Sequence, residues 1–171
     1  MALGREQQAL PTLTHLTITD LRTLPKAKAL DLLHHISSLE RKVFPQNEAF
    51  GFQNDLLSKQ NTFILVVCDK VQEWPPILGY AVYVRWQGCL LLHKLCVNPK
   101  YRGRGIGKFL MEEIIVRARK SSCQLIELWV DESRKVARGL YRRFDFQEAD
   151  RRENYYAQGR HGIKMFLKLS E

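Results

Sequence analysis

The chain has 171 residues, of which 45% are hydrophobic and 26% are charged, and its formal net charge at pH 7 is +9. This length suits one domain of ~100–150 residues, and the composition is that of an ordinary globular protein. No stretch approaches the ~20 apolar residues of a transmembrane helix, so we expect no membrane partner. Most of the basic excess lies between Lys100 and Arg160. Because no zinc-finger, basic-zipper or aromatic nucleic-acid-binding motif accompanies it, we expect no specific nucleic-acid partner.

Cysteines and histidines are dispersed along the chain. The four cysteines form no CxxC pair, lie mostly in apolar runs, and are accompanied by no HExxH motif. We therefore expect free thiols in a reducing compartment and no metal site. The N-terminal residues lack the basic-then-apolar pattern of a secretion signal, which favours a cytoplasmic or nuclear protein. Residues 1–12 are predicted to be a flexible lead-in, and residues 13–171 a single domain.

The first half of the chain predicts one main helix and four strands. Lys26–Val43 carries apolar residues at helical spacing and ends before Pro45, and Asn54–Gln60 is expected to add a short helix. Alternating or β-branched apolar runs predict strands at Leu13–Thr19, Thr62–Cys68, Ile77–Trp86 and Cys89–Val97. Gln87-Gly88 is a turn between the last two strands, so strands two to four form an antiparallel meander.

The second half alternates helices and strands. Apolar periodicity predicts a helix at about Gly105–Lys120, and Ser133 is expected to cap a second helix that carries Leu140 and Phe144. Further strands are predicted at Gln124–Val130, Phe146–Tyr156 and Ile163–Leu169. The predicted fold class is therefore α+β, with a mixed sheet, helices on both faces, and one β-α-β unit.

A glycine-rich loop lies between the fourth strand and the following helix. Its sequence is Arg102-Gly103-Arg104-Gly105-Ile106-Gly107, followed by Lys108. Glycines allow backbone amides to approach a ligand closely, and a helix N-terminus adds partial positive charge. The loop therefore predicts a pyrophosphate site, although glycines also serve as simple turn formers. It is not a P-loop, because no GK[ST] follows, and it comes too late in the chain for a dinucleotide fold.

The longer string around this loop, from Leu95 to Gly107, resembles the acetyl-CoA motif of the GNAT acetyltransferase superfamily. That motif is [QR]-x-x-G-x-[GA] after a strand, and the preceding L-x-V-x-P-x-Y-R also matches. The segment Leu128–Tyr141, followed by Phe144-Asp145-Phe146, is similar to the second motif of the family. The resemblance covers roughly residues 13–169.

This resemblance implies a GNAT fold whose sheet is splayed at strand 89–97 and whose cosubstrate is acetyl-CoA. Backbone groups of Leu95, Cys96 and Val97 would bind the pantetheine, and the amides of residues 102–108 would bind the pyrophosphate. The chain departs from the pattern at Arg134, where many relatives have Asn. An Arg at this position contacts a CoA phosphate in one interpretation and points to solvent in the other.

Three residues are candidates for proton transfer. His93 lies among leucines in a strand expected to be buried, and its position resembles that of a catalytic histidine in arylalkylamine N-acetyltransferases; the alternative is a structural core histidine. Glu127 shares a strand face with Trp129, which stands where several protein acetyltransferases have Glu or His, but a surface charge is the better explanation of Glu127. Tyr141 matches the tyrosine that protonates the CoA thiolate in the family; the alternative is packing.

Two further features concern the acceptor amine. Phe44-Pro45 resembles the turn that lines the substrate cleft of protein N-terminal acetyltransferases, and Tyr155-Tyr156 before Gly159 resembles their late hairpin. Helix termination and hairpin packing are the structural alternatives. Together the features favour a protein or peptide α-amine, with lysine as a further acceptor. A polyamine is less attractive because the chain is basic. The competing class is a noncatalytic GNAT-fold module that binds CoA or a protein; the sequence does not predict the oligomeric state.

Overall fold

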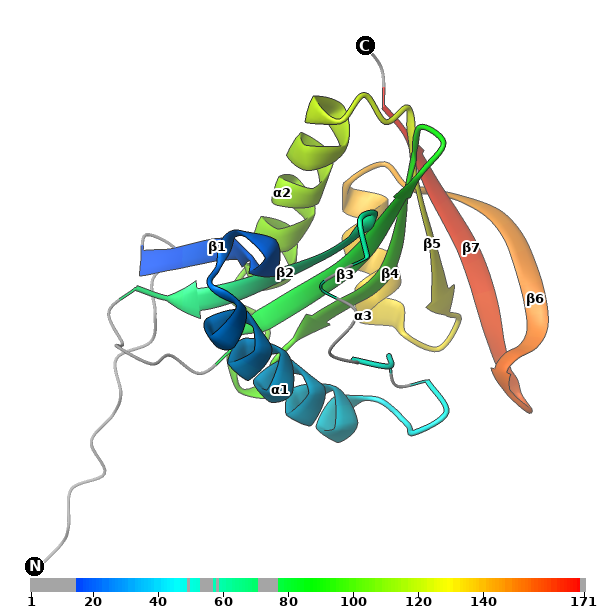
Figure 1. Cartoon of the computed structure of the whole chain (residues 1–171). Coiled ribbons are helices and arrows are strands. Elements are labelled where there is room, and N and C mark those ends of the chain that lie inside the picture. The colour runs from blue at the N-terminus through cyan, green and yellow to red at the C-terminus, as the bar shows by residue number, and fades with distance from the viewer. Residues whose placement is uncertain (1–14, 49, 53–56, 58, 71–76, 170–171) are drawn as a thin grey trace, which may run out of the picture.

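One seven-stranded sheet organises the protein (Figure 1). The computed structural model describes residues 15–48, 50–52, 57, 59–70 and 77–169. The strand order is β1-β2-β3-β4-β5-β7-β6, and neighbours are antiparallel except for the parallel pair β4 and β5. The strands are β1 (Leu16–Asp20), β2 (Thr62–Asp69), β3 (Gly79–Trp86), β4 (Cys89–Val97), β5 (Leu125–Asp131), β6 (Gln147–Ala157) and β7 (Arg160–Lys168).

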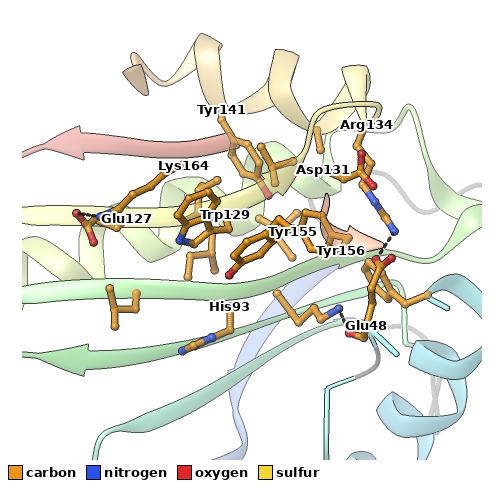
Figure 2. A pocket seen from close by; sticks show the side chains of 18 of the residues that line it. Glu48, His93, Glu127, Trp129, Asp131, Arg134, Tyr141, Tyr155, Tyr156 and Lys164 are labelled. Atoms are coloured by element: carbon orange, nitrogen blue, oxygen red, sulfur yellow. Dashed lines mark hydrogen bonds and ion pairs between the residues drawn. The ribbon is translucent and has the colours of Figure 1, made fainter. Parts of the chain in front are cut away.

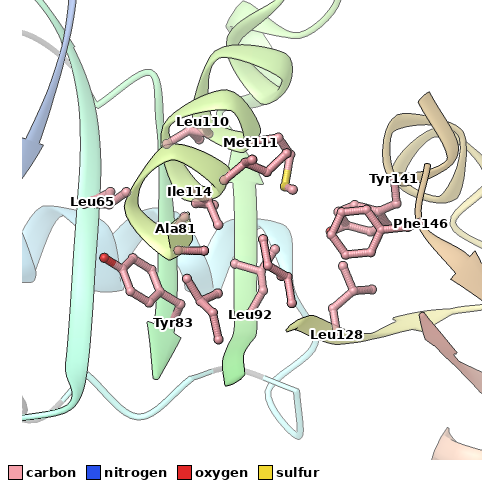
Figure 3. Close-up of a cluster of buried hydrophobic side chains, with 14 of the residues drawn as sticks. Leu65, Ala81, Tyr83, Leu92, Leu110, Met111, Ile114, Leu128, Tyr141 and Phe146 are labelled. Carbon is pink, nitrogen blue, oxygen red and sulfur yellow. The ribbon is translucent and has the colours of Figure 1, made fainter. Parts of the chain in front are cut away.

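Helices cover both faces of the sheet, as the sequence predicts. They are α1 (Lys26–Val43), α2 (Ile106–Lys120) and α3 (Lys135–Arg143). The buried side chains of α1 belong to one hydrophobic cluster, and those of α2 and α3 belong to a second. Figure 3 shows the second cluster, in which α2 packs on β3 and β4 while Tyr141 and Phe146 extend the cluster toward β5. None of the described helices combines the length and apolarity needed to cross a membrane.

Strand β2, between β1 and β3, is continuously apolar because helices cover both of its faces. Leu65 and Val67 belong to the cluster under α2, whereas Ile64 and Val66 belong to the cluster under α1. Because successive strand residues point to opposite faces, a strand with helices on both sides must be apolar at every position. The edge strand β6 has the opposite character: it is largely exposed and rich in charge, which discourages pairing with another chain.

Most predicted elements are confirmed, with small shifts at their ends. The predicted helix Lys26–Val43 is α1, which ends where Phe44 becomes extended before Pro45. The lead-in at residues 1–12 lies outside the described residues, as does most of the short helix expected at Asn54–Gln60.

The expected cap of α3 is wrong. Arg134, not Ser133, is the N-cap residue, and it makes no side-chain capping bond. The Ser133 hydroxyl instead donates a 2.7 Å hydrogen bond to Asp131 Oδ1, and the Ser133 amide donates to the same oxygen at 2.8 Å. A short polar side chain readily makes such local bonds, which compete with helix capping.

Candidate active site

Strands β4 and β5 separate part-way along their length. They pair over Cys89–Leu92 and Leu125–Leu128 and no further, although β4 continues to Val97 and β5 to Asp131. Beyond the paired part, β4 remains bonded to β3, and β5 remains bonded to β7. The facing edges therefore carry backbone groups that no described strand pairs, and such an edge can receive an extended ligand as an added strand. The splay expected within strand 89–97 is confirmed.

A β-bulge at His93 coincides with the separation. Lys94 lies opposite Val82, and Leu92 lies opposite the next residue of β3, Tyr83, so His93 is an extra residue in β4. A bulge bends its strand and increases the local twist. This accounts physically for the divergence of the second half of β4 from β5.

The expectation that His93 is buried is wrong, because the bulge leaves this side chain exposed. Its ring lies 6.1 Å from the Phe50 ring, measured between centroids. Partial desolvation lowers the pKa of the imidazole below its ordinary value. His93 is therefore a neutral, solvent-accessible imidazole at pH 7, and Figure 2 shows it on the β4 side of the pocket, across from Tyr141.

The diverging strands enclose a pocket of about 560 Å³. Its walls come from the segment after α1, from β4, from β5 and α3, and from the β6–β7 hairpin (Figure 2). Of the sequence-predicted residues, the pocket brings together Phe44, His93, Leu95, Glu127, Arg134, Tyr141, Tyr155 and Tyr156.

Tyr141 reaches the pocket from α3. Its ring is buried, with its centroid 5.7 Å from that of Phe146. Burial raises the pKa of the phenol to about 12, although the nearby charge of Arg134 acts in the opposite direction. The hydroxyl, which points into the pocket in Figure 2, is thus protonated at neutral pH and available as a donor.

Glu127 lies at the other end of the pocket from Glu48 (Figure 2). Its carboxylate is paired with Lys164, whose Nζ lies 3.0 Å from Oε1. The neighbouring residue on the same strand face, Trp129, stacks on Tyr155 with ring centroids 4.6 Å apart and planes 12° apart. Because the Glu127 carboxylate is already engaged by Lys164, this arrangement favours the surface-charge interpretation of Glu127.

The glycine loop forms the N-terminus of α2. Gly103 and Gly105 have φ values of 74° and 80°, a left-handed conformation that favours glycine. Gly105 is the N-cap and makes no side-chain capping bond, and the first turn contains no acidic residue. The first amides of a helix lack intrahelical partners. This end of α2 therefore has the donors and the charge of an anion site.

Three basic side chains surround that helix end. The Nε of Arg102 donates to the carbonyl oxygen of Val97 at 3.2 Å, and Lys108 pairs with Glu112 at 3.6 Å. Arg104 lies over the Tyr101 ring, and its buried Nη1 has no hydrogen-bond partner among the described residues. An unsatisfied guanidinium beside free helix amides fits an anionic ligand.

The β4 segment before the loop offers its backbone rather than its side chains. Leu95 and Val97 are half-buried against the larger cluster, whereas Cys96 is buried in the cluster under α1. Burial raises the pKa of the Cys96 thiol to about 12. Cys96 is therefore a protonated, inert core residue at neutral pH.

Phe44 and Arg134 meet at one end of the pocket. The Cζ of Arg134 lies 4.6 Å from the Phe44 ring centroid, and Lys94 Nζ lies 3.7 Å from the same centroid. Arg134 does not simply point to solvent, because its Nη2 pairs with Glu48 Oε2 at 3.4 Å; its contact with a CoA phosphate stays a prediction. Pro45, unlike Phe44, is not among the residues that line the pocket.

Three charged residues of this end were missed in the sequence. Glu48 and Asp131 are buried carboxylates, and Arg160 bonds to both of them. Burial alone raises the pKa of Asp131, but hydrogen bonds from Ser133 and Arg160 outweigh burial and lower it. The Asp-x-Ser turn after β5 is a local signal that could have identified Asp131. Glu48 and Arg160 carry no such signal, since they are 112 residues apart.

Across the part of the chain that the structure describes, no group of three or more His, Cys, Asp or Glu side chains could hold a metal ion.

Known proteins share this sequence pattern and this architecture. The chain is 34% identical over 87 residues to the [ribosomal protein bS18]-alanine N-acetyltransferase of Haemophilus influenzae. The matched segment covers 51% of this chain and 59% of that protein. In two further relatives, from Methanocaldococcus jannaschii and Bacillus subtilis, the chain spans only 26% and 52% of the length.

Solved structures of low sequence identity share the fold. The ribosomal-protein-S18-alanine N-acetyltransferase of Escherichia coli superposes with a TM-score of 0.72 at 22% identity, over 91% of this chain and 95% of that one. The NAA60 protein of Arabidopsis thaliana in complex with a bisubstrate analogue gives 0.73 at 18% identity, over 89% and 98%.

The sequence profile of the Acetyltransferase (GNAT) family matches residues 29–146, which is more than half of the chain. Together with the splayed mixed sheet and the glycine loop at the N-terminus of α2, this match shows that the chain belongs to the GNAT acetyltransferase family.

Proposed function

We propose that the protein is an acetyl-CoA-dependent N-acetyltransferase whose acceptor is the α-amine of a protein or peptide N-terminus. The observation that carries the proposal is the pocket itself. The unpaired edge of β4 runs toward the free amides of α2, and a protonated tyrosine faces the pocket where β4 and β5 part. Relatives named as ribosomal protein alanine N-acetyltransferases support the acceptor class.

On the acetyl-CoA side, two backbone features would bind the cosubstrate. The edge of β4 at Leu95–Val97 would hydrogen-bond the pantetheine as an added strand. The amides of residues 102–108, with the basic side chains around them, would hold the pyrophosphate, because a helix N-terminus favours negative charge. The buried, unpartnered Nη1 of Arg104 supports this assignment.

Acetyl transfer moves two protons, and the pocket offers a group for each. The amine nitrogen attacks the thioester carbonyl, loses its proton, and displaces the CoA sulfur, which then acquires one. The Tyr141 hydroxyl would donate to that sulfur, and the neutral imidazole of His93 would accept the amine proton, through water. An α-amine with a pKa of ~8 is roughly a tenth neutral at pH 7, whereas lysine at ~10.4 is below a tenth of a percent, so a modest base suffices for an N-terminus.

The acceptor would bind between Phe44 and the β6–β7 hairpin. Tyr155 and Tyr156 line this part of the pocket, and Tyr155 is fixed by its stack on Trp129. This wall supplies apolar contact area and phenol hydroxyls for a peptide, but aromatic faces also attract cations, so the preference for a peptide over a polyamine rests on charge. The Glu127–Lys164 pair leaves no free carboxylate at that end of the pocket to attract a polyamine.

The experiment that tests the proposal measures acetyl-CoA turnover with three acceptor classes. These are peptides with free α-amines and varied first residues, the same peptides with a blocked N-terminus and an internal lysine, and spermidine. We expect the free α-amine peptides to have the highest kcat/KM. A preference for spermidine or for the blocked peptides would refute the assignment of the acceptor.

One observation favours the noncatalytic alternative. The β5 position at which several relatives place a base is Trp129, and the adjacent carboxylate, Glu127, is already paired. Tight acetyl-CoA binding in a calorimetric titration, without turnover on any of the three acceptor classes, would establish a CoA-binding module instead.

A further inference from the structure

A network of ion pairs and hydrogen bonds, centred on two buried carboxylates, joins opposite walls of the pocket at its Phe44 end. We call it the cross-pocket clamp, and its members are Asn47, Glu48, Asp131, Arg134 and Arg160. Asn47 and Glu48 come from the segment after α1, Asp131 ends β5, Arg134 precedes α3, and Arg160 begins β7. Figure 2 shows Glu48, Asp131 and Arg134 together at this end of the pocket.

Glu48 is the centre of the clamp. Its side chain is only 5% exposed, and its Oε1 accepts a hydrogen bond from Nη1 of Arg160 while its Oε2 pairs with Nη2 of Arg134 at 3.4 Å. Arg160 uses its second nitrogen, Nη2, on Asp131, which is also buried. One guanidinium therefore bridges two carboxylates from different walls.

Bonds to backbone carbonyl oxygens add to this bridge. The side-chain amide of Asn47 donates to the carbonyl oxygen of Tyr156 at 3.0 Å, and Lys94 Nζ donates to the carbonyl oxygen of Glu48 at 2.6 Å. Arg160 also lies over the Tyr156 ring, with its Cζ 5.7 Å from the ring centroid. The Tyr156 backbone and ring are thus both held by residues of the clamp.

A buried ion-pair network adds little net stability, because desolvation of the charges offsets their attraction. Its directional bonds nevertheless fix the distance between the groups that they join. In this protein those groups carry Phe44 and Tyr156, the facing residues of the proposed acceptor region. The network is therefore better explained by the spacing that it sets between the pocket walls than by stabilisation of the fold.

We infer that Glu48 is a positioning residue for the acceptor amine: through Arg160 it holds the segment after α1 against the β6–β7 hairpin and so sets the spacing between Phe44 and Tyr156. The inference rests on the proposed function only in requiring that the pocket receive an amine. Both carboxylate oxygens of Glu48 are engaged by arginines, and the role inferred for it is to hold the two walls together.

The first test is kinetic and uses Glu48→Gln, Arg160→Gln and the double variant. The acceptor is whichever amine of the three classes above the wild-type protein acetylates fastest. Loss of one charge-assisted bond predicts an acceptor KM about tenfold higher, with kcat and the Kd for acetyl-CoA little changed. Since the inferred role depends on the bond between Glu48 and Arg160, the double variant should raise the acceptor KM no further than the more impaired of the two single variants.

Glu148→Gln is the matched control. Glu148 also accepts bonds from two arginines, Arg138 at 2.8 Å and Arg142 at 2.7 Å, but it lies on β6 outside the pocket. We expect this variant to keep the wild-type acceptor KM. An equal rise of KM in the control would mean that removing any such charge disturbs acetylation, and it would overturn the positioning role.

The second test needs no substrate. Hydrogen–deuterium exchange of the free protein should become faster at both residues 44–48 and 155–160 in Glu48→Gln, while α2 stays protected. Faster exchange confined to residues 44–48 would show that the walls are not coupled, which contradicts the clamp.

Two kinetic outcomes separate this inference from the proposed function. Absence of turnover with every amine removes the proposed function and the positioning role together. An unchanged acceptor KM in variants that still turn over overturns the positioning role alone. A loss of acetyl-CoA affinity that parallels the rise in acceptor KM also overturns it, because Glu48 would then act on the cosubstrate through Arg134.

Discussion

Gly162 determines where the aromatic wall of the pocket lies, and its replacement by alanine is a sharp perturbation. A Cβ atom at Gly162 would lie 2.8 Å from Cγ of Tyr155 and 2.9 Å from both Cβ and Cδ1 of the same residue. Carbon atoms pack at about 3.5–4.0 Å, so the contact is too short by nearly 1 Å at Cβ and at two ring atoms of Tyr155. Tyr155 must therefore move, and its stack on Trp129 must be disturbed.

The expected magnitude follows from these contacts. Overpacking costs about 1–3 kcal/mol, and the loss of an aromatic pair adds about 0.5–1.5 kcal/mol. We expect Gly162→Ala to lower the free energy of unfolding by about 1.5–4.5 kcal/mol in urea titrations. The same variant should raise the acceptor KM without weakening acetyl-CoA binding, because Gly162 lies on β7, away from the α2 loop.

Gly139→Ala is the control of opposite sign. Its Cβ would meet no atom within 4 Å, and Gly139 lies inside α3. Alanine in a helix interior stabilises by about 0.5–1 kcal/mol relative to glycine. The reasoning would be refuted by a Gly162→Ala variant that has the wild-type urea midpoint, the wild-type near-ultraviolet circular dichroism of the Trp129–Tyr155 pair, and the wild-type acceptor KM. Such a result would mean that the close approach of Gly162 does not fix the Tyr155 ring.

Three further predictions concern the proposed chemistry. Tyr141→Phe should lower kcat by about 10²-fold or more, with little change in the KM for acetyl-CoA, because the phenol acts on the leaving sulfur in the transition state; an unchanged kcat would reduce Tyr141 to packing. His93 is active when unprotonated and its pKa is lowered, so kcat/KM should rise with pH through an apparent pKa below 6.5. His93→Ala should remove this rise with pH and lower kcat/KM by about 10²–10⁴-fold. One acceptor must be used throughout, because an α-amine itself titrates near ~8; an unchanged rate and pH profile would show that His93 takes no part in proton transfer. Gly105→Val should abolish acetyl-CoA binding in a calorimetric titration while circular dichroism stays native-like, since a branched residue is strained at a φ of 80° and would cover the helix amides; wild-type affinity would show that the loop is only a turn.

The sequence by itself determined the elements and the chemistry of the α2 loop. Helical periodicity in α1 and α2 and the apolar run of β2 are local patterns set by which face is buried, so they can be read before the fold is known. Gly103 and Gly105 are equally readable, because their motif specifies a backbone shape and a set of amides rather than a distant partner.

The acceptor end of the pocket was decided by tertiary structure. His93 was expected in the core because it stands among leucines, but one extra residue in β4 opposite Val82 and Tyr83 puts it on an exposed bulge. Arg134 pairs with Glu48, and Glu48 pairs with Arg160, which lies 112 residues further along the chain. Charge pairing depends on which side chains meet after the sheet has formed, and no local pattern carries that information; the walls that face the acceptor are therefore a property of the assembled sheet.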